Sequence, residues 1–187
     1  MTTSNSPLAR TRVAVLVGSL RPDSLNRKVA ELVRDRAPEG VELDIVDGLD
    51  DLPFYEEGLD ATATPAAATA LRERVRAADA ILVVTPEYNG TMPAVLNNAI
   101  DWLSRPYGAG AIVGKPLGVT GTTPTPYGGK WAHEDTVRSA GIAGAIAVDG
   151  AVHSQSVLEV DPLGDDEVVA EFLRVLDAVV SYQPVAA

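Results

Sequence analysis

Residues 80–104 read AILVVTPEYNGTMPAVLNNAIDWLS and hold an apolar run, a polar turn and a helical pattern in direct succession. The run at 80–85 is short and rich in β-branched residues, which predicts a buried central strand. From Met92 to Ser104 the apolar residues fall on one face at helical spacing, and Pro93 suits the first turn, where its missing N–H is not needed. A strand followed at once by a helix is the unit of a parallel α/β sheet.

The same unit recurs along the chain. Short apolar runs predict strands at 13–17, 41–46, 116–121 and 143–148, and amphipathic patterns predict helices at 24–36, 65–77, 129–140 and 165–182. Five such units predict a flavodoxin-like three-layer α/β sandwich with a five-stranded parallel sheet in the order 2-1-3-4-5. We expect a single flavodoxin-like domain over 1–187, with a loop at 47–64 and disordered tails at 1–10 and 183–187.

Composition and charge exclude several classes of protein. The sequence has no cysteine and two histidines, which excludes thiol catalysis and thiolate zinc sites and disfavours any metal site. The net charge is −11, and residues 39–61 hold nine acids and no base, so nucleic acid is not expected as a partner. No apolar run reaches the roughly 20 residues of a membrane span. Residues 1–10 lack the apolar stretch of a signal peptide, so we expect a cytoplasmic protein.

Three loops follow the central strands, at 18–26, 85–92 and 121–129, and they are the richest in Gly, Ser, Thr, Asn and Tyr. In sheets of this kind, ligands bind outside the carboxyl ends of the strands. The three loops are therefore the candidate ligand site.

The first loop reads GSLRPDSLN and leads into a helix. A helix N-terminus offers unpaired N–H groups and a partial positive charge, which suit a phosphate. Ser19, Ser24 and Asn26 can add hydrogen bonds to it. Arg21 can add a full charge. The alternative is that Ser24 or Asp23 only caps the helix, which leaves Ser19 and Arg21 unexplained.

The second loop begins PEYNG at Pro86, and with it a resemblance becomes specific. GSLRxxSxN, followed some sixty residues later by PEYNGxxPxxLxNAIDWxSR, resembles the NAD(P)H-dependent FMN reductase family of flavodoxin-like quinone, azo-dye and chromate reductases. The resemblance extends from Val13 to the last helix. It implies FMN as the cofactor and NADPH or NADH as the electron donor.

The resemblance also implies roles for the loop residues. The first loop would hold the FMN phosphate, the second would border the isoalloxazine ring, and the third would close its far side. The expected FMN contacts are Ser19, Arg21, Ser24, Leu25, Asn26, Pro86, Glu87, Tyr88, Asn89, Gly90, Thr122, Tyr127, Gly128 and Gly129. No side chain need act as a general acid or base, because the chemistry takes place on the flavin.

The implied activity passes hydride from NAD(P)H through FMN to a small acceptor. Donor and acceptor would share one pocket, which gives a ping-pong mechanism. A quinone, a flavin, an azo compound or a metal oxyanion could be the acceptor. Two alternatives stay open: a flavodoxin-type electron carrier that does not oxidise NAD(P)H, and a domain of this fold without flavin.

Residues outside the loops suggest a subunit contact. Trp102 is expected at the edge of the apolar face of its helix, with Asn98 and Arg105 beside it, a pattern typical of interfaces. This pattern predicts a homodimer or homotetramer whose partner covers this face. The alternative is that the wide apolar face of the helix packs wholly into the core, with Trp102 at the core edge. His133 is expected at a surface or capping position near the ligand end, and His153 in a polar loop without a role.

Overall fold

Strands and helices alternate along the residues that the structure, a computed structural model, describes: 10–158 and 160–184. The elements are β1 (Thr11–Val17), α1 (Leu25–Asp35), β2 (Val41–Val46), the 3-10 helix η1 (Leu49–Asp51), α2 (Glu57–Ala63), α3 (Ala66–Ala77), β3 (Ala80–Val84), α4 (Ala94–Leu103), β4 (Pro116–Thr123), α5 (Lys130–Ile142), β5 (Ile146–Ser156) and α6 (Asp166–Val180). Of the two predicted tails, residues 1–9 and 185–187 lie outside the described part of the chain.

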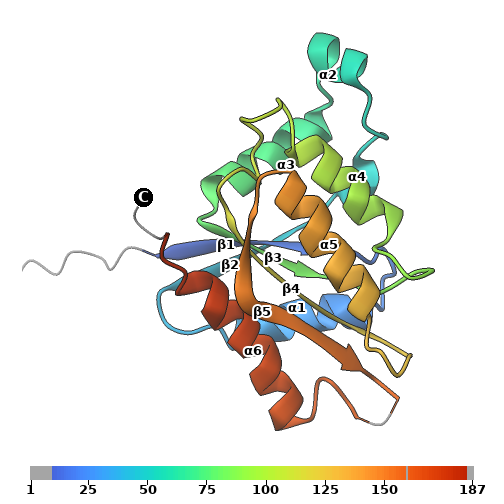
Figure 1. Cartoon of the computed structure of the whole chain (residues 1–187), viewed down its shortest axis with the longest axis vertical. Helices are drawn as coiled ribbons and strands as arrows, with labels where there is room; N and C mark the ends of the chain where they lie inside the picture. Colours follow the sequence, from blue (N-terminus) through green and yellow to red (C-terminus); the bar gives the residue numbers. More distant parts are fainter. Residues whose placement is uncertain (1–9, 159, 185–187) are drawn as a thin grey trace, which may run out of the picture.

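All five strands pair in parallel in one sheet, in the order β2-β1-β3-β4-β5. Figure 1 shows α1 and α6 on one side of this sheet and α3, α4 and α5 on the other. The predicted flavodoxin-like sandwich is therefore confirmed. No helix within the described ranges is long and apolar enough to cross a membrane.

The central strands divide their side chains between two cores. Along β1, Val13, Val15 and Val17 join the core under α1 and α6, whereas Ala14 and Leu16 join the core under α3 and α4. Successive side chains of a strand point to opposite faces, and here both faces are buried. This explains why β1 and β3 read as continuous apolar runs rather than as alternating patterns.

The last two strands are longer than the sequence predicts. β5 continues to Ser156 and pairs with β4 beyond a register shift between Leu117 and Val119. His153, which we expected in a loop, therefore lies in a strand, with its ring against Phe172. The HSQS stretch is polar because β5 is an edge strand, and a polar edge strand cannot be told from a loop by hydropathy alone.

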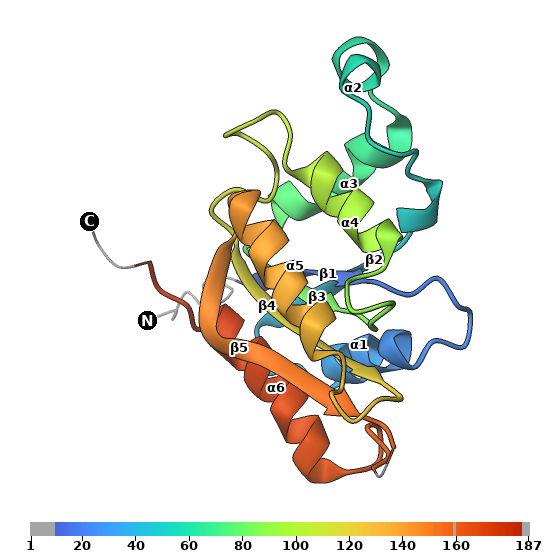
Figure 2. The same cartoon turned by 45° about the vertical axis from the view of Figure 1, so that its right-hand side comes forward.

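The segment 47–64 is not the plain loop that we predicted, since it contains η1 and α2. The Glu56 carboxylate caps α2 by accepting hydrogen bonds from the N–H groups of Gly58 and Leu59. Asp60 of α2 receives two hydrogen bonds of 2.7 Å from the guanidinium of Arg72, which is buried on α3. This ion pair fastens the helix that projects from the body of the protein in Figure 2.

The same segment covers Trp102, and the prediction that a partner subunit does so is wrong. Trp102 is fully buried, and its indole N–H donates to the carbonyl of Pro53 at 2.8 Å. The ring of Tyr55 packs edge-on against it at 5.0 Å. Asn98, expected on a polar rim, is also buried and pairs with the backbone of Pro53 and Tyr55. An acidic stretch that looks solvated in the sequence thus closes the core through its few apolar residues.

Candidate functional site

The three candidate loops converge at Thr85, the first residue after β3. Its N–H donates to the carbonyl of Thr120 on β4 at 2.9 Å, and its side chain is buried. A Cβ atom on Gly18 of the first loop would lie 2.2 Å from Thr85 Oγ1, and one on Gly121 would lie 2.0 Å from the Thr85 carbonyl oxygen. Glycine is required at both positions, because a side chain would collide with the Thr85 side chain at Gly18 and with the Thr85 backbone at Gly121.

In the first loop, Ser24 is the N-cap of α1. Its buried Oγ accepts a hydrogen bond of 3.3 Å from the N–H of Arg27. The capping alternative therefore accounts for Ser24. Within the described residues, the N–H groups of Leu25 and Asn26 take part in no hydrogen bond, so the start of α1 keeps donors for an anion.

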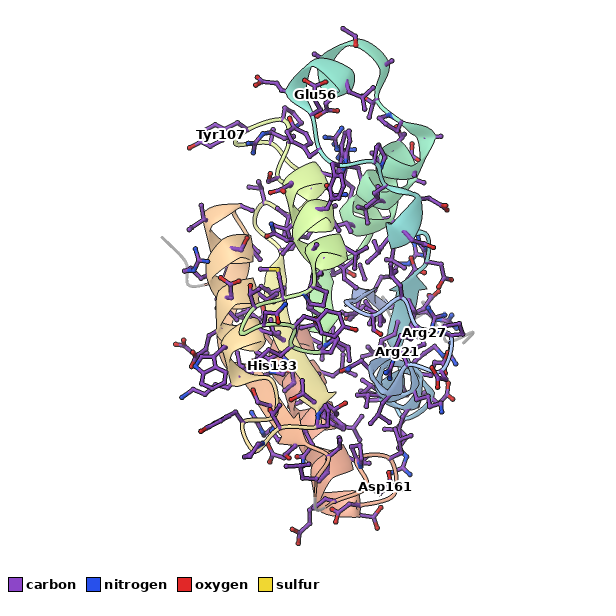
Figure 3. All side chains as sticks on the ribbon, turned by 90° about the vertical axis from the view of Figure 1, so that its right-hand side faces the viewer. Arg21, Arg27, Glu56, Tyr107, His133 and Asp161 are labelled. Atoms are coloured by element: carbon purple, nitrogen blue, oxygen red, sulfur yellow. The ribbon has the colours of Figure 1, made fainter. Side chains whose placement is uncertain are left out.

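Two arginines stand beside these donors (Figure 3). The Arg27 guanidinium forms ion pairs with Glu31 and Asp47, and its hydrogen bond to Asp47 raises its pKa. Arg21 is exposed, and no carboxylate in the described part of the chain lies within 4.0 Å of its guanidinium. Both side chains line a hollow of about 410 Å³ between the first loop and the end of β2. Arg21 is thus the cation of this loop that is available to a ligand.

The second loop makes a tight hairpin. The N–H and carbonyl of Tyr88 pair with those of Thr91, at 3.0 and 3.1 Å. Between them, Asn89 and Gly90 have positive φ angles of 53° and 76°, the conformation of the Asn-Gly hairpin turn. A Cβ atom on Gly90 would meet nothing within 4 Å. The turn therefore presents backbone to open space, where a planar ring can approach it.

Glu87 joins the second loop to α5. Its Oε2 accepts hydrogen bonds from the N–H groups of Trp131 and Ala132, at 3.1 and 3.2 Å. A carboxylate at a helix N-terminus is favoured by the helix dipole. Glu87, which we expected beside the flavin ring, thus acts as the cap of α5. The sequence does not reveal this role because the capping residue lies more than forty positions before the helix.

Asn26 joins the first loop to the third. Its Nδ2 donates to the carbonyl of Thr122 at 3.0 Å, and its Oδ1 accepts from the N–H of Thr122 at 2.8 Å. The side-chain amide thus pairs with a strand end as a neighbouring backbone would. We expected Asn26 to contact the phosphate; its side-chain amide holds Thr122, so its backbone N–H is the group that can serve a ligand.

The third loop lies against β5 at Gly128 and against the His133 ring at Gly129, and these glycines have φ angles of 62° and 95°. A Cβ atom on Gly128 would lie 2.7 Å from the backbone of Ser154, so only glycine fits. The rings of Tyr127 and Trp131 flank the two glycines with their centroids 4.6 Å apart. They are 57% and 46% exposed, so this aromatic pair forms an open rim on the loop.

For His133, the predicted surface or capping position is wrong. This residue is fully buried rather than at the surface. Its Nε2 lies 3.0 Å from the carbonyl oxygen of Thr85, and its Nδ1 lies 2.7 Å from Oγ of Ser154. Burial lowers the pKa of His133 to about 4, so the ring is neutral at pH 7. The sequence signal was weak because the partners of His133 are distant in the chain: Thr85 directly follows β3, and Ser154 lies on β5.

A parallel sheet whose carboxyl edge carries an anion-binding helix start and an open backbone turn defines a nucleotide-binding flavodoxin-like protein. A family model described as NADPH-dependent FMN reductase matches residues 11–158. The chain therefore belongs to the NADPH-dependent FMN reductase family.

Individual relatives agree with this assignment. A quinone reductase of Pseudomonas putida is 50% identical over 117 residues, which is 63% of this chain and 62% of the relative. A 2-hydroxy-1,4-benzoquinone reductase of a Burkholderia species is 44% identical, over 60% of each chain. These matches span about three fifths of the relatives' own length. The solved structure of FerB, a flavoenzyme NAD(P)H:(acceptor) oxidoreductase from Paracoccus denitrificans, has a TM-score of 0.76 at 34% identity and covers 91% of this chain and 95% of that one.

The residues present fit an FMN. The N–H donors at the start of α1 and the charge of Arg21, which has no carboxylate partner in the described part of the chain, suit a phosphate. The hairpin at Asn89 and Gly90 offers backbone to a ring edge, and glycines stand where a side chain would obstruct the loops. The ring and the phosphate of an FMN would thus be bound by different loops at the carboxyl edge of the sheet.

Proposed function

We propose that this protein is an FMN-dependent NAD(P)H oxidoreductase that reduces quinones. One observation carries the proposal: Arg21, which has no carboxylate partner among the described residues, and the open turn at Asn89 and Gly90 lie on neighbouring loops of the same sheet edge. They suit the two ends of one FMN. The names of the relatives, quinone reductase and NAD(P)H:(acceptor) oxidoreductase, support the activity and the acceptor class.

The first loop would bind the FMN phosphate. Ser19 and Arg21 line the hollow beside this loop, and the N–H groups of Leu25 and Asn26 add donors. Ser24 and the side chain of Asn26 would keep these groups in place, since both already hold protein backbone. Binding at the phosphate end would therefore depend most on Arg21.

The second and third loops would bind the ring. Pro86, Tyr88 and the turn residues would border it, while Thr122, Tyr127, Gly128 and Gly129 would close its other side. Bound FMN supplies the hydride-accepting and hydride-donating centre, N5 of its ring. The protein's own residues orient that ring, exclude water from it and leave one face open to NAD(P)H and then to the acceptor.

A single open face implies ping-pong kinetics, because donor and acceptor cannot occupy it together. The half-exposed rings of Tyr127 and Trp131 are well suited to a planar aromatic acceptor such as a quinone. Flavins, azo compounds and metal oxyanions remain acceptors to compare with it. Both NADH and NADPH are candidate donors.

The decisive experiment has two stages. First, the flavin released on denaturation is identified, and FMN rather than FAD is expected. Second, the FMN-loaded protein is mixed anaerobically with NADH or NADPH, and bleaching of the flavin band followed by reoxidation with a quinone is expected. Flavin that neither nucleotide bleaches would indicate a flavodoxin-type electron carrier. Protein that binds no flavin would overturn the proposal.

Assembly and location remain predictions. Trp102 is buried within its own chain and cannot anchor a partner subunit. The exposed aromatic residues that could do so in a homodimer or homotetramer are Phe54 and Tyr107, which are 82% and 90% exposed. Figure 3 shows Tyr107 at the same end of the molecule as Glu56, which directly precedes α2. Light scattering would measure the mass in solution, and cell fractionation would test the expected cytoplasmic location.

A further inference from the structure

The imidazole of His133 lies where three elements of the site meet. It comes from the first turn of α5 and contacts Thr85 at the end of β3 and Ser154 on β5, at 3.0 and 2.7 Å. Its side chain has no exposed surface. Figure 3 shows its place on α5, across from the two labelled arginines of the first loop.

The hydrogen bonds of His133 permit one tautomer. The carbonyl oxygen of Thr85 can only accept, so Nε2 must carry the proton. In the neutral ring Nδ1 is then an acceptor, and the hydroxyl of Ser154 must donate to it. Both ring nitrogens are paired, and a flipped ring would leave two buried groups without partners, which is costly.

The carbonyl that His133 holds is the last one before the second loop. Thr85 precedes Pro86, which has no N–H and cannot anchor the chain through a donor of its own. On the other side, the N–H of Thr85 is fixed by Thr120. The chain is therefore fixed where it turns from β3 toward Asn89 and Gly90 by the hydrogen bond from His133 to the Thr85 carbonyl, together with the one from the Thr85 hydroxyl to the Pro86 carbonyl at 3.0 Å.

We propose that His133 is a positioning residue for the flavin ring, which acts through the Thr85 carbonyl to fix the direction of the loop 86–90. This inference rests on the proposed function, because it concerns the ring end of the same FMN site. The phosphate end would be bound by the first loop, and among the described residues the hydrogen bonds of the His133 ring go to Thr85 and Ser154 instead. A change at His133 should therefore affect ring binding and phosphate binding differently.

Riboflavin and FMN separate these two contributions, since they differ only in the phosphate. His133→Leu removes both hydrogen bonds and should lower the affinity for riboflavin and for FMN by the same factor, about tenfold. The ratio of the two affinities should stay at the wild-type value. His133→Gln, whose amide offers one donor and one acceptor, should restore most of the lost affinity. Arg21→Ala is the matched control and should lower the affinity for FMN alone.

Two further measurements keep the test independent of folding defects. Far-UV circular dichroism and urea unfolding of each apo-protein show whether the variant is folded. If His133→Leu does not fold, Ser154→Ala replaces it, because it leaves Nδ1 without a donor and should weaken riboflavin binding in the same direction. In the wild-type apo-protein, ¹⁵N NMR of the ring should show a neutral imidazole with its proton on Nε2.

The possible failures can be told apart. A folded His133→Leu protein that binds riboflavin as tightly as the wild type would overturn the positioning role and leave the proposed function intact. So would a ring whose proton is on Nδ1. A His133→Leu protein that loses affinity for FMN but not for riboflavin would also contradict it. Wild-type protein that binds neither flavin would overturn the proposed function and this inference with it.

Discussion

The indole N–H of Trp102 donates to the carbonyl oxygen of Pro53 at 2.8 Å, which joins α4 to a segment 49 residues earlier in the chain. The guanidinium of Arg72 lies over the same indole ring, 5.3 Å from its centroid. Trp102, which we expected to contact a second subunit, thus packs inside its own chain. Substitutions of Trp102 should therefore change the stability of the folded chain.

Trp102→Ala should lower the free energy of unfolding by about 3–5 kcal/mol, because it leaves a large cavity and removes one of the two hydrogen bonds that the Pro53 carbonyl accepts. Trp102→Phe should cost about 1–2 kcal/mol through the lost hydrogen bond and the smaller ring. Phe54→Ser is the control and should leave stability nearly unchanged, since Phe54 is 82% exposed. Urea unfolding of the apo-proteins measures all three. A Trp102→Ala protein of wild-type stability would show that the contact is not formed in solution.

Arg21→Ala should weaken FMN binding by about 1.5–3 kcal/mol, the usual contribution of a hydrogen bond to a charged group. Arg27→Ala should change it little, because the guanidinium of Arg27 is already paired with Glu31 and Asp47. Titration of each apo-protein by flavin fluorescence quenching gives the affinities. Equal losses in the two variants would argue against Arg21 as the phosphate-binding cation.

Asn26→Asp is nearly isosteric but should be destabilising by about 1–3 kcal/mol. The carboxylate can still accept from the N–H of Thr122, but it cannot donate to the carbonyl of Thr122, and two acceptors then face each other in a buried place. The added charge should also weaken FMN binding beside the first loop. Asn26→Ser is smaller and uncharged, so it separates the loss of the hydrogen bonds to Thr122 from the effect of the added charge. Unfolding and FMN titrations on both variants check the prediction.

Stability should fall in mildly acidic solution because of His133. Its pKa is lowered from 6.5 to about 4 in the folded protein by burial, so the unfolded chain takes up the proton first as the pH falls. The stabilising contribution is complete above pH 6.5 and is lost between pH 6.5 and 4, by roughly 3 kcal/mol over that range.

His133→Gln does not titrate, so its stability should decline less over the same range. His153 also has a lowered pKa, but it is present in both proteins and cancels in the comparison. Unfolding free energies measured at several pH values supply the difference curve. A curve that is flat between pH 6.5 and 4 would mean that His133 is accessible to protons in the folded state.

Trp131→Ala should raise the KM for a quinone severalfold, with little change in the rate at which NAD(P)H reduces the flavin. The reason is that the exposed ring of Trp131 lies on the rim of the loop and offers stacking area to the acceptor, worth roughly 0.5–1.5 kcal/mol. Ferricyanide, which has no aromatic plane, is the control acceptor and should react equally fast with both proteins. Steady-state and stopped-flow kinetics separate the two half-reactions.

The sequence by itself determined the sheet, its strand order and the three loops of the site. These features follow from short-range signals: continuous apolar runs mark strands that are buried on both faces, and Asn89-Gly90 has a strong preference for one turn. The loop residues were identified as a group for the same reason, because each loop directly follows a strand.

Only the tertiary structure decided which site residues hold the protein and which are left for a ligand. Asn26, Glu87 and His133 pair with groups 96, 44 and 48 positions away, and nothing local in the sequence distinguishes them from residues that face a ligand. The burial of Trp102 was equally hidden, since it depends on a distant acidic segment folding back over α4. Hydropathy reports what a residue prefers to contact, whereas the partner of a polar side chain is fixed only when the folded backbone places a donor or acceptor within reach.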